Sequence, residues 1–373
     1  MKNFKLSVLA LSMTCFSAWA LAAPGACDVI AGGQGYRAAL KVQDVENYVT
    51  ASTYEELKQY VDKDEQFIFI PGDITITVPN LSTALHFKSG QTVFSDRGID
   101  GSKGALLVTQ WLNDDENTYP VYAVESDVRL TGLRFEGPTN EATTNNKTIG
   151  MQFVSNSSNI QIDNNEIYNW PWSGVNVKSS IDNKVHHNFI HDNLRSERGY
   201  GVVVQNGNAQ AEIYCNTFNA NRHAIAGSGE DGEGYYAHNN LVLNGGGRAA
   251  YHQFDMHLGS TGHGGKFITA TDNIFDYGAY GTSNRRSIYM RGVPTDGAIT
   301  VAGNIFTQPW EVGSQKAVAG VEDSVPSEAE IEAVNTFNAA ASYTQNNDGI
   351  CTVNVASRSL PVNCDSVATV LTN

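Results

Sequence analysis

The chain has 373 residues, of which 41% are hydrophobic, 10% aromatic and 17% charged, and this composition excludes a disordered chain. The formal net charge of −15 argues against a general nucleic-acid binder, which needs a basic face to displace counterions. The length fits either two domains or one elongated repeat domain, because a repeat fold grows without needing a larger core.

The first residues have the pattern of an export signal. Lys2 and Lys5 precede an apolar run over residues 6–21, and Ala20 and Ala22 are the small residues that a signal peptidase reads. We therefore expect residues 1–22 to be a signal peptide. No later stretch reaches the run of about 18 apolar residues that a membrane span requires. The sequence thus predicts a secreted or periplasmic protein without a membrane span.

Export makes disulfide bonds possible, and four cysteines follow the predicted signal. Cys351 and Cys364 lie close together in the sequence, so we expect them to pair. Cys27 and Cys215 are then paired by elimination.

The first predicted elements are a helix and a strand. Residues 53–61 have the apolar spacing of a short amphipathic helix, and residues 67–76 form an apolar, β-branched run that predicts a strand. From residue 84 to residue 310 there is almost no helical periodicity.

A repeated phrase fills this long segment instead. Alternating apolar and polar residues lead into Asn-x-(Ile/Phe/Leu), and the successive asparagines are 23, 28, 24, 33 and 31 residues apart. Residues 128–135 fit the same frame one turn earlier. A repeat of roughly 20–50 residues built from short strands is typical of a solenoid. The repeated asparagines are Asn165, Asn188, Asn216, Asn240, Asn273 and Asn304.

These asparagines are expected to be structural rather than catalytic. Stacked coils place equivalent residues above one another at about 4.8 Å, so an inward amide can bond to the next amide in its column. Asparagine also tolerates the left-handed backbone of a tight turn between strands.

The asparagine phrase resembles the right-handed parallel β-helix repeat of the pectate-lyase-like superfamily, over about residues 49–306. The opening helix and strand are similar to the N-terminal cap of such lyases, and residues 95–105 also resemble a phrase of these proteins. The resemblance implies an all-β fold, a single-stranded right-handed parallel β-helix with a short N-terminal helical cap and a C-terminal cap. It does not fix the function, because the superfamily includes lyases, hydrolases, epimerases and adhesins.

The end of the chain changes character. We expect the β-helix to occupy residues 23–310 and residues 311–373 to form a C-terminal capping segment, since an open coil exposes strand edges and apolar side chains. Residues 326–334 have a helical pattern, and the Cys351–Cys364 loop follows them.

A second short strand follows the asparagine phrase in five coils, at residues 174–178, 201–205, 224–228, 253–257 and 287–291. Because neighbouring side chains of a strand point to opposite sides, aligning these strands turns their apolar residues inward. Two outward columns remain, and a third set stands at the corner just before the strands. The columns are Asn176, Val203, Ala226, Asp255 and Tyr289, then Lys178, Gln205, Ser228, His257 and Arg291, with Ser173, Tyr200, His223, His252 and Arg286 at the corner.

Basic, histidine and tyrosine side chains thus gather on one face of an acidic protein. A cationic cleft attracts an anionic polymer even when the whole protein is negative. We therefore predict an acidic polysaccharide as the partner of a monomeric protein; a register shift of one residue would invert every side chain. The predicted substrate-binding residues are Lys178, Arg222, Arg248, His252, Asp255, Lys266 and Arg286.

The face suits β-elimination of a uronate polymer. This reaction needs a cation to neutralise the carboxylate, a base to remove the C5 proton and an acid for the leaving oxygen. We expect Arg291 or Arg248 to bind the carboxylate, and His223 or His257 to act as the base. Tyr289 is the expected acid. The predicted catalytic residues are therefore His223, His257, Tyr289 and Arg291.

Metal-dependent chemistry is an open alternative. His252, Asp255 and His257, with His263 in the following glycine-rich loop, are ligand types that a transition metal accepts. Many lyases of the superfamily need calcium, but these coils have no dense outward cluster of aspartates. Residues 230–233 form either a calcium loop or a solvated turn. No cofactor is identified, and Ca²⁺ or another divalent metal stays a candidate.

Two other functions compete with a lyase. A glycoside hydrolase on the same scaffold would need two or three acidic residues around the scissile bond, and Asp255 alone gives little support for it. A non-catalytic carbohydrate-binding or adhesin module would use the same face without turnover. Trp170 and Trp172 either stack on a sugar ring or pack at a coil corner.

Overall fold

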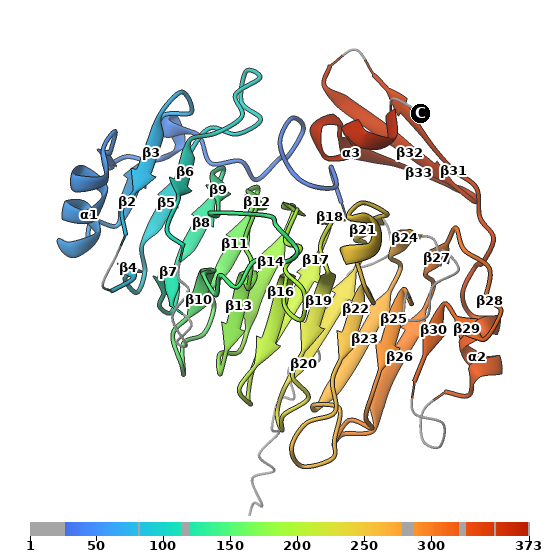
Figure 1. Cartoon of the computed structure of the whole chain (residues 1–373). Helices are drawn as coiled ribbons and strands as arrows, with labels where there is room; N and C mark the ends of the chain where they lie inside the picture. The colour runs from blue at the N-terminus through green and yellow to red at the C-terminus, as the bar shows by residue number, and fades with distance from the viewer. Residues whose placement is uncertain are drawn as a thin grey trace, which may run out of the picture.

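The structure is a computed structural model that describes residues 27–80, 83–112, 119–277, 286–320, 326–346 and 348–371. The predicted signal peptide lies outside these residues. The described chain is an all-β parallel β-helix, as predicted, in which three parallel sheets of ten, nine and nine strands wind around one core (Figure 1).

Each full coil contributes one strand to each sheet. Sheet one contains β1 (Val49–Thr50), β2 (Phe67–Phe69), β5 (Thr92–Phe94), β8 (Arg129–Thr131), β11 (Gln161–Asp163), β14 (Asn183–His186), β17 (Gln210–Tyr214), β20 (Gly234–His238), β23 (Phe267–Thr271) and β26 (Ala298–Ala302). Sheet two contains β4 (Leu85–Phe87), β7 (Pro120–Val124), β10 (Ile149–Phe153), β13 (Ser173–Lys178), β16 (Tyr200–Gln205), β19 (His223–Gly227), β22 (Phe254–Met256), β25 (Ile288–Met290) and β30 (Val318–Ala319). Sheet three contains β3 (Thr75–Val78), β6 (Leu106–Thr109), β9 (Arg134–Glu136), β12 (Glu166–Tyr168), β15 (Phe189–His191), β18 (Thr217–Asn219), β21 (Leu241–Leu243), β24 (Ile274–Asp276) and β27 (Ile305–Phe306).

The predicted helix is present as α1 (Tyr54–Asp62). It follows the short η1 (Val42–Asp44) and lies at the N-terminal end of the β-helix (Figure 1). The Thr53 side chain caps α1 by accepting a hydrogen bond from the Glu56 backbone N–H, and Leu57 and Val61 are fully buried in the core. The single strand predicted over residues 67–76 is instead divided between β2 and β3. Pro71 and Gly72 interrupt it, because a coil corner needs residues that leave the sheet.

The repeated asparagines form a continuous hydrogen-bonded ladder inside the coils, as expected. Each Nδ2 donates to the Oδ1 of the next asparagine at 2.9–3.2 Å, and each Oδ1 also accepts from a backbone N–H. The ladder continues from Asn304 to Asn335 at 2.9 Å, one step beyond the predicted repeat. A single column of amides therefore satisfies buried polar groups at one corner of the coils from Asn165 to Asn335.

The left-handed backbone lies one residue earlier than expected. The ladder asparagines do not have positive φ angles; the residues before them do, among them Asn164 (57°), His187 (53°), Cys215 (54°) and Asn239 (54°). The ladder asparagine follows this turn and points inward, so its role is hydrogen bonding rather than backbone tolerance.

Replacing Asn240 with alanine should lower the free energy of unfolding by about 3 kcal/mol. The substitution removes the acceptor of the buried Asn216 backbone N–H and the Nδ2 group that donates to the Ile213 carbonyl and to Asn273 Oδ1, and each unpaired buried group costs about 1–3 kcal/mol. Urea unfolding measures the effect. Asn140→Ala, at an exposed position, is the control and should change it by less than about 0.5 kcal/mol. Equal effects of the two variants would contradict the structural role of the ladder.

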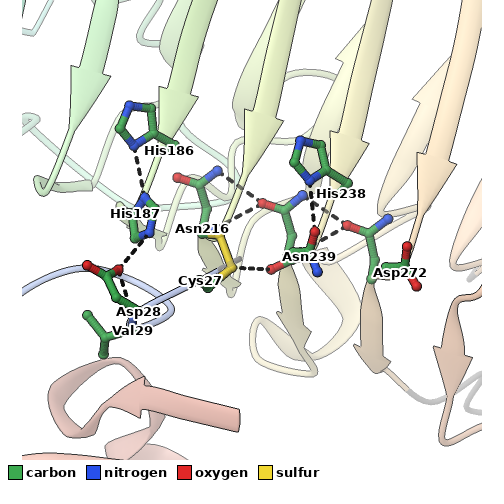
Figure 2. The surroundings of a disulfide bond; sticks show 12 residues. Cys27, Asp28, Val29, His186, His187, Asn216, His238, Asn239 and Asp272 are labelled. Carbon is green, nitrogen blue, oxygen red and sulfur yellow. Dashed lines mark hydrogen bonds and ion pairs between the residues drawn. A yellow bond between two sulfur atoms is a disulfide. The ribbon is translucent and has the colours of Figure 1, made fainter. Parts of the chain in front are cut away.

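The N-terminal segment before the coils, residues 27–38, crosses the outside of the β-helix and is fixed there. Cys27 forms a disulfide with Cys215, and Asp28 lies beside His187 (Figure 2). The Tyr36 hydroxyl donates to Asp163 at 3.0 Å. Both predicted disulfides are confirmed, since Cys351 also pairs with Cys364.

The C-terminal part first covers the end of the β-helix and then its side. The parallel strands pass the expected boundary at residue 310, since β30 continues sheet two. The hairpin of β28 (Glu311–Val312) and β29 (Gln315–Lys316) precedes β30, and α2 (Glu328–Ala333) follows it. Ile331 of α2 is buried in the core, and the Phe337 ring stacks on Phe306 at 4.7 Å.

The last elements form a small antiparallel sheet of β31 (Ala341–Gln345), β32 (Ile350–Val355) and β33 (Arg358–Asn363), followed by α3 (Cys364–Leu371) (Figure 1). Val353 and Val367 pack with Leu241 and Leu243 of sheet three in a second core. This sheet therefore covers a flank of the β-helix rather than its open end. None of the helices in the described ranges is long and apolar enough to cross a membrane.

Candidate functional site

Sheet two has the register that the sequence predicts. Asp255 pairs with Ala226 on one side and with Tyr289 on the other, and the column continues to Val203 and Asn176. The side chains predicted to point inward on these strands are fully buried. They are Val175, Val202, Ile225, Phe254 and Ile288.

A buried carboxylate is the centre of this face. Asp255, on β22, is fully buried, and both of its oxygens bind Arg291, with Nε 2.9 Å from Oδ1 and Nη2 2.5 Å from Oδ2. His257 Nε2 lies 3.0 Å from Oδ2, and His223 Nδ1 lies 3.7 Å away. Burial would raise the pKa of Asp255, but the contact with His257 and the nearby charges outweigh it and hold this pKa well below its usual value. Asp255 is therefore an anion that orients the groups around it.

His223, at the start of β19, is enclosed on all sides. It has no exposed surface; its Nδ1 lies 2.5 Å from the His252 carbonyl oxygen, and its Nε2 lies 2.5 Å from Arg222 Nη1. Because a carbonyl only accepts and a guanidinium only donates, Nδ1 carries the proton and Nε2 accepts. Burial, together with the charge of Arg222, lowers the pKa of His223 to about 3, so the ring is neutral. Neither ring nitrogen remains for a substrate.

His257 has the opposite environment. It follows β22, and its side chain is 34% exposed while Nε2 faces Asp255. Arg291, on the next coil, is 30% exposed. The buried carboxylate therefore holds one imidazole and one guanidinium at the surface, side by side.

Aromatic rings complete the cluster. The Arg222 guanidinium lies 4.9 Å from the Tyr251 ring, and those of Arg286 and Arg291 lie 4.5 and 5.1 Å from the Tyr289 ring. In the described part of the chain, Arg222 and Arg286 form no ion pair with a carboxylate, unlike Arg291. These two guanidinium groups are thus available to an anionic ligand.

His252 lies between two of these rings. Its own ring is 4.5 Å from Tyr251 and 4.8 Å from Tyr289, and it is 2% exposed. Burial lowers the pKa of His252 to about 3, so it is neutral. Its Nδ1 is buried and has no hydrogen-bond partner among the described residues.

Two predicted substrate-binding residues, Lys178 and Lys266, lie outside the cluster, and the side chain of a third is not described. Lys178 ends β13, three coils from His257 along the same outward column. Lys266 belongs to the loop that leads to β23 of sheet one. The backbone of Arg248 lies in η2 (Gly247–Ala249), and the structure does not describe its side chain.

The predicted metal-ligand set is not assembled. His263 lies on the loop after β22 and is 3.3 Å from Asp231 instead. Two members of the set, Asp255 and His257, lie instead with His223, and one ligand atom from each of these three residues is within 4.8 Å of the others. Arg291 takes both Asp255 oxygens and Arg222 faces His223, so these positive groups and occupied ligand atoms do not fit a divalent cation.

The candidate calcium loop does not fit a cation either. Glu230 accepts hydrogen bonds from Ser260, and Asp231 accepts one from Thr261. Glu233 is buried and accepts from the Ser228 hydroxyl and the Gly229 backbone. The three carboxylates bond to separate partners, so residues 230–233 form a turn that these hydrogen bonds hold in place.

The site also includes residues that the sequence analysis did not select. Tyr200 stacks on His223 at 5.5 Å, and Tyr251 packs against Arg222. Tyr200 belongs to the predicted corner set with His223 and His252, and this alignment was the sequence feature that could have placed it in the site. Tyr251 precedes a strand by several residues, and only the loop conformation brings it to the cluster.

Comparison with known proteins supports the fold. No family model and no curated protein matches the chain. Among solved structures, the alginate lyase from Paenibacillus sp. str. FPU-7 is similar over 78% of this chain and 95% of that one, at 16% identity and a TM-score of 0.54. A Geobacillus virus E2 protein (ORF18; 11% identity, TM-score 0.41, 82% of this chain and 66% of that one) and the Dettilon tailspike protein (11%, 0.39, 87% and 82%) are more distant. At 16% identity, the likeness to the alginate lyase shows the fold alone.

Proposed function

We propose that the protein is an exported polysaccharide lyase that cleaves an acidic, uronate-containing polysaccharide by β-elimination. One observation carries the proposal: the buried Asp255 holds a partly exposed His257 and Arg291 next to Tyr289. Imidazole, phenol and guanidinium are the base, acid and carboxylate-binding groups that this reaction requires.

The proposed reaction uses these side chains as follows. Arg286 and Arg222 bind the uronate carboxylate and stabilise the negative charge that develops when C5 loses its proton. His257 takes that proton, and the electrons of the C5–H bond form a C4–C5 double bond as the C4–O bond breaks. Tyr289 gives its proton to the leaving oxygen. Asp255 orients the His257 ring and balances the charge that the ring gains.

Tyr289 is well placed for the acid role. The two guanidinium groups over its ring offset the negative charge that grows on the phenol oxygen as the proton leaves. Arg291, already bound by Asp255, supports Tyr289 rather than the substrate carboxylate. In this proposal Arg222 and Arg286, rather than Arg291, bind the carboxylate.

His223 becomes a positioning residue in this scheme. Of the two expected bases, it is the one without exposure, and both of its nitrogens are occupied. Its Nε2 accepts a hydrogen bond from Arg222 Nη1 and so positions that guanidinium. Loss of His223 would therefore disturb carboxylate binding rather than proton transfer.

Two further observations support the proposal. The protein of similar fold is an alginate lyase, which makes alginate the first polymer to test. The two disulfides support an exported protein, secreted or periplasmic. A hydrolase is less well supported, because no second carboxylate of the described residues bonds to the cluster.

The test is incubation of the purified protein with alginate, pectate and glycosaminoglycans. A lyase produces the ultraviolet absorbance of unsaturated uronate ends, in step with new reducing ends. New reducing ends without this absorbance would show a hydrolase. Binding without either product would show a carbohydrate-binding module.

Chelation should not reduce the activity. Arg291 and Arg222 occupy the places where a divalent ion would bind, so dialysis against EDTA is expected to leave the rate unchanged. A loss of activity that Ca²⁺ restores would contradict this assignment of the carboxylate-binding role to arginine.

A further inference from the structure

A second cluster of arginine and tryptophan lies on the same face, nearer the N-terminus. Trp172 immediately precedes β13, and the loop of residues 192–199 brings two arginines to it. The guanidinium carbon of Arg198 is 4.3 Å from the Trp172 ring centroid, and that of Arg195 is 5.8 Å away. Arg222 and Tyr251 repeat this arrangement at the proposed catalytic site.

This cluster has donors without acceptors. Trp172 Nε1, Arg195 Nη1 and Arg198 Nε are buried and find no hydrogen-bond partner within the described residues. Among the described residues, the arginines that form ion pairs with carboxylates are Arg129, Arg291 and Arg358. Arg195 and Arg198 form no such pair there. Three unmet N–H donors and two positive charges suit a ligand rich in anionic oxygens.

The backbone holds the cluster in place. Arg195 Nε donates to the Thr144 carbonyl at 3.0 Å, and the Ser196 N–H donates to the Ala142 carbonyl at 2.7 Å. The Gly199 and Tyr200 N–H groups both donate to the Trp172 carbonyl at 3.0 Å. The loop is therefore joined both to Trp172 and to the neighbouring coil.

A continuous path connects this cluster with the proposed catalytic site. Tyr200 lies between them: its ring stacks on His223, and the charges of Arg198 and Arg222 both oppose the rise that burial causes in its pKa. Gly199 occupies the coil position between Trp172 and Arg222. Its φ is +73°, and a Cβ atom there would lie 2.5 Å from the Asn193 carbonyl oxygen, so this position carries no side chain that would interrupt the path.

We propose that Trp172, Arg195 and Arg198 form a second binding site for an anionic sugar unit of the polymer. The inference rests on the proposed function and extends it: the chain would run along the coils, with one unit at this Trp172 site and the cleaved bond near Asp255. The two places are three coils apart, or about 14 Å. The enzyme would then favour long chains over fragments too short to reach both.

Binding measured without turnover tests the Trp172 site directly. In native gels that contain alginate or pectate, Arg198→Ala and Trp172→Ala should each raise the apparent Kd about tenfold, the effect of one charge-assisted contact. Arg198→Lys tests the stacked, planar group, and Trp172→Phe, which keeps a ring, should bind better than Trp172→Ala. Arg37→Ala removes an exposed arginine from the N-terminal segment and should change nothing.

Kinetics give a second readout. With long chains, both alanine variants should raise KM about tenfold at unchanged kcat, while rates on di- and trisaccharides stay as in the wild type. Circular dichroism checks that the variants are folded.

The outcomes separate this inference from the proposed function. Wild-type affinity and KM in folded Arg198→Ala and Trp172→Ala would overturn the Trp172 site and leave a lyase standing. Weakened binding by these variants in a protein that never cleaves the polymer would keep the Trp172 site and overturn the lyase. A wild-type protein that binds no acidic polymer would overturn both.

Discussion

Replacing His257 with asparagine should lower kcat on the cleaved uronate polymer by about 10²–10⁴-fold, the contribution of a general base. Asparagine keeps a polar group near Asp255 but cannot take the C5 proton. Because Arg222 and Arg286 still bind the substrate carboxylate, KM should change little. The measurement is the initial rate of formation of unsaturated uronate over a range of substrate concentrations.

His86 provides the matched control. It lies on β4 in the same outward column of sheet two as Asp255, is exposed, and stands 3.6 Å from Glu125. Six coils, or about 29 Å, separate it from the proposed site. His86→Asn should therefore keep full activity. If His257→Asn also kept its kcat, His257 would not be the base.

Replacing Asp255 with asparagine should damage both activity and stability. The amide cannot balance the charge of Arg291, and removing one partner of a buried ion pair costs about 3–5 kcal/mol. His257 also loses the group that orients it, so kcat should fall at least about 10²-fold. Urea unfolding and lyase assays on the same preparation measure the two effects.

Asp163 separates the two effects. Like Asp255, it is fully buried and accepts hydrogen bonds from two nitrogens of one arginine, Arg129 Nε at 2.8 Å and Nη2 at 2.7 Å. Unlike Asp255, it lies on sheet one. Asp163→Asn should cost similar stability and leave kcat unchanged where the protein is folded. If both variants lost activity equally, the effect of Asp255→Asn would be one of folding alone.

The stability effect of Asp255→Asn should depend on pH. The folded protein holds the pKa of Asp255 well below that of the unfolded chain, which is about 4. This group therefore adds stability above about pH 4 and loses that contribution as the pH falls further. The difference between wild type and Asp255→Asn should be full at pH 7 and shrink below pH 4. A difference that stayed constant down to pH 2 would contradict the charged state of Asp255.

The fold and the register could be predicted because both follow from local patterns. The two-residue alternation decides which side chains of β13, β16, β19, β22 and β25 are buried, and the asparagine spacing marks each coil. Asn335 was missed because its phrase lacks the preceding strand and follows a helix. The disulfides could be predicted because only four cysteines follow the predicted signal peptide and two of them, Cys351 and Cys364, are close in the sequence.

The chemistry of the face depended on contacts that no alternation encodes. His223 and His257 look equivalent in the sequence, but Arg222 and the His252 carbonyl enclose one of them, and the other reaches solvent. The predicted metal set raises a related point, since Arg291, 36 residues after Asp255, binds both oxygens of its carboxylate. Loop conformation and long side chains decide these points.

The segment at residues 27–38 has a consequence for how the molecule matures. Ile30 is bonded on both sides to β33, through Pro361 and Asn363, while Cys27 is joined to Cys215, 188 residues away. This segment precedes the coils in the chain, yet its docking surface is complete only when the last strands have folded. Its other partners, Cys215, His187 and Asp163, belong to coils that precede β33 in the chain, so the segment can bond to the β-helix before β33 adds the last contacts. The Cys27–Cys215 disulfide would then hold Ile30 on the coils as an edge with which β33 can pair when the C-terminal sheet folds.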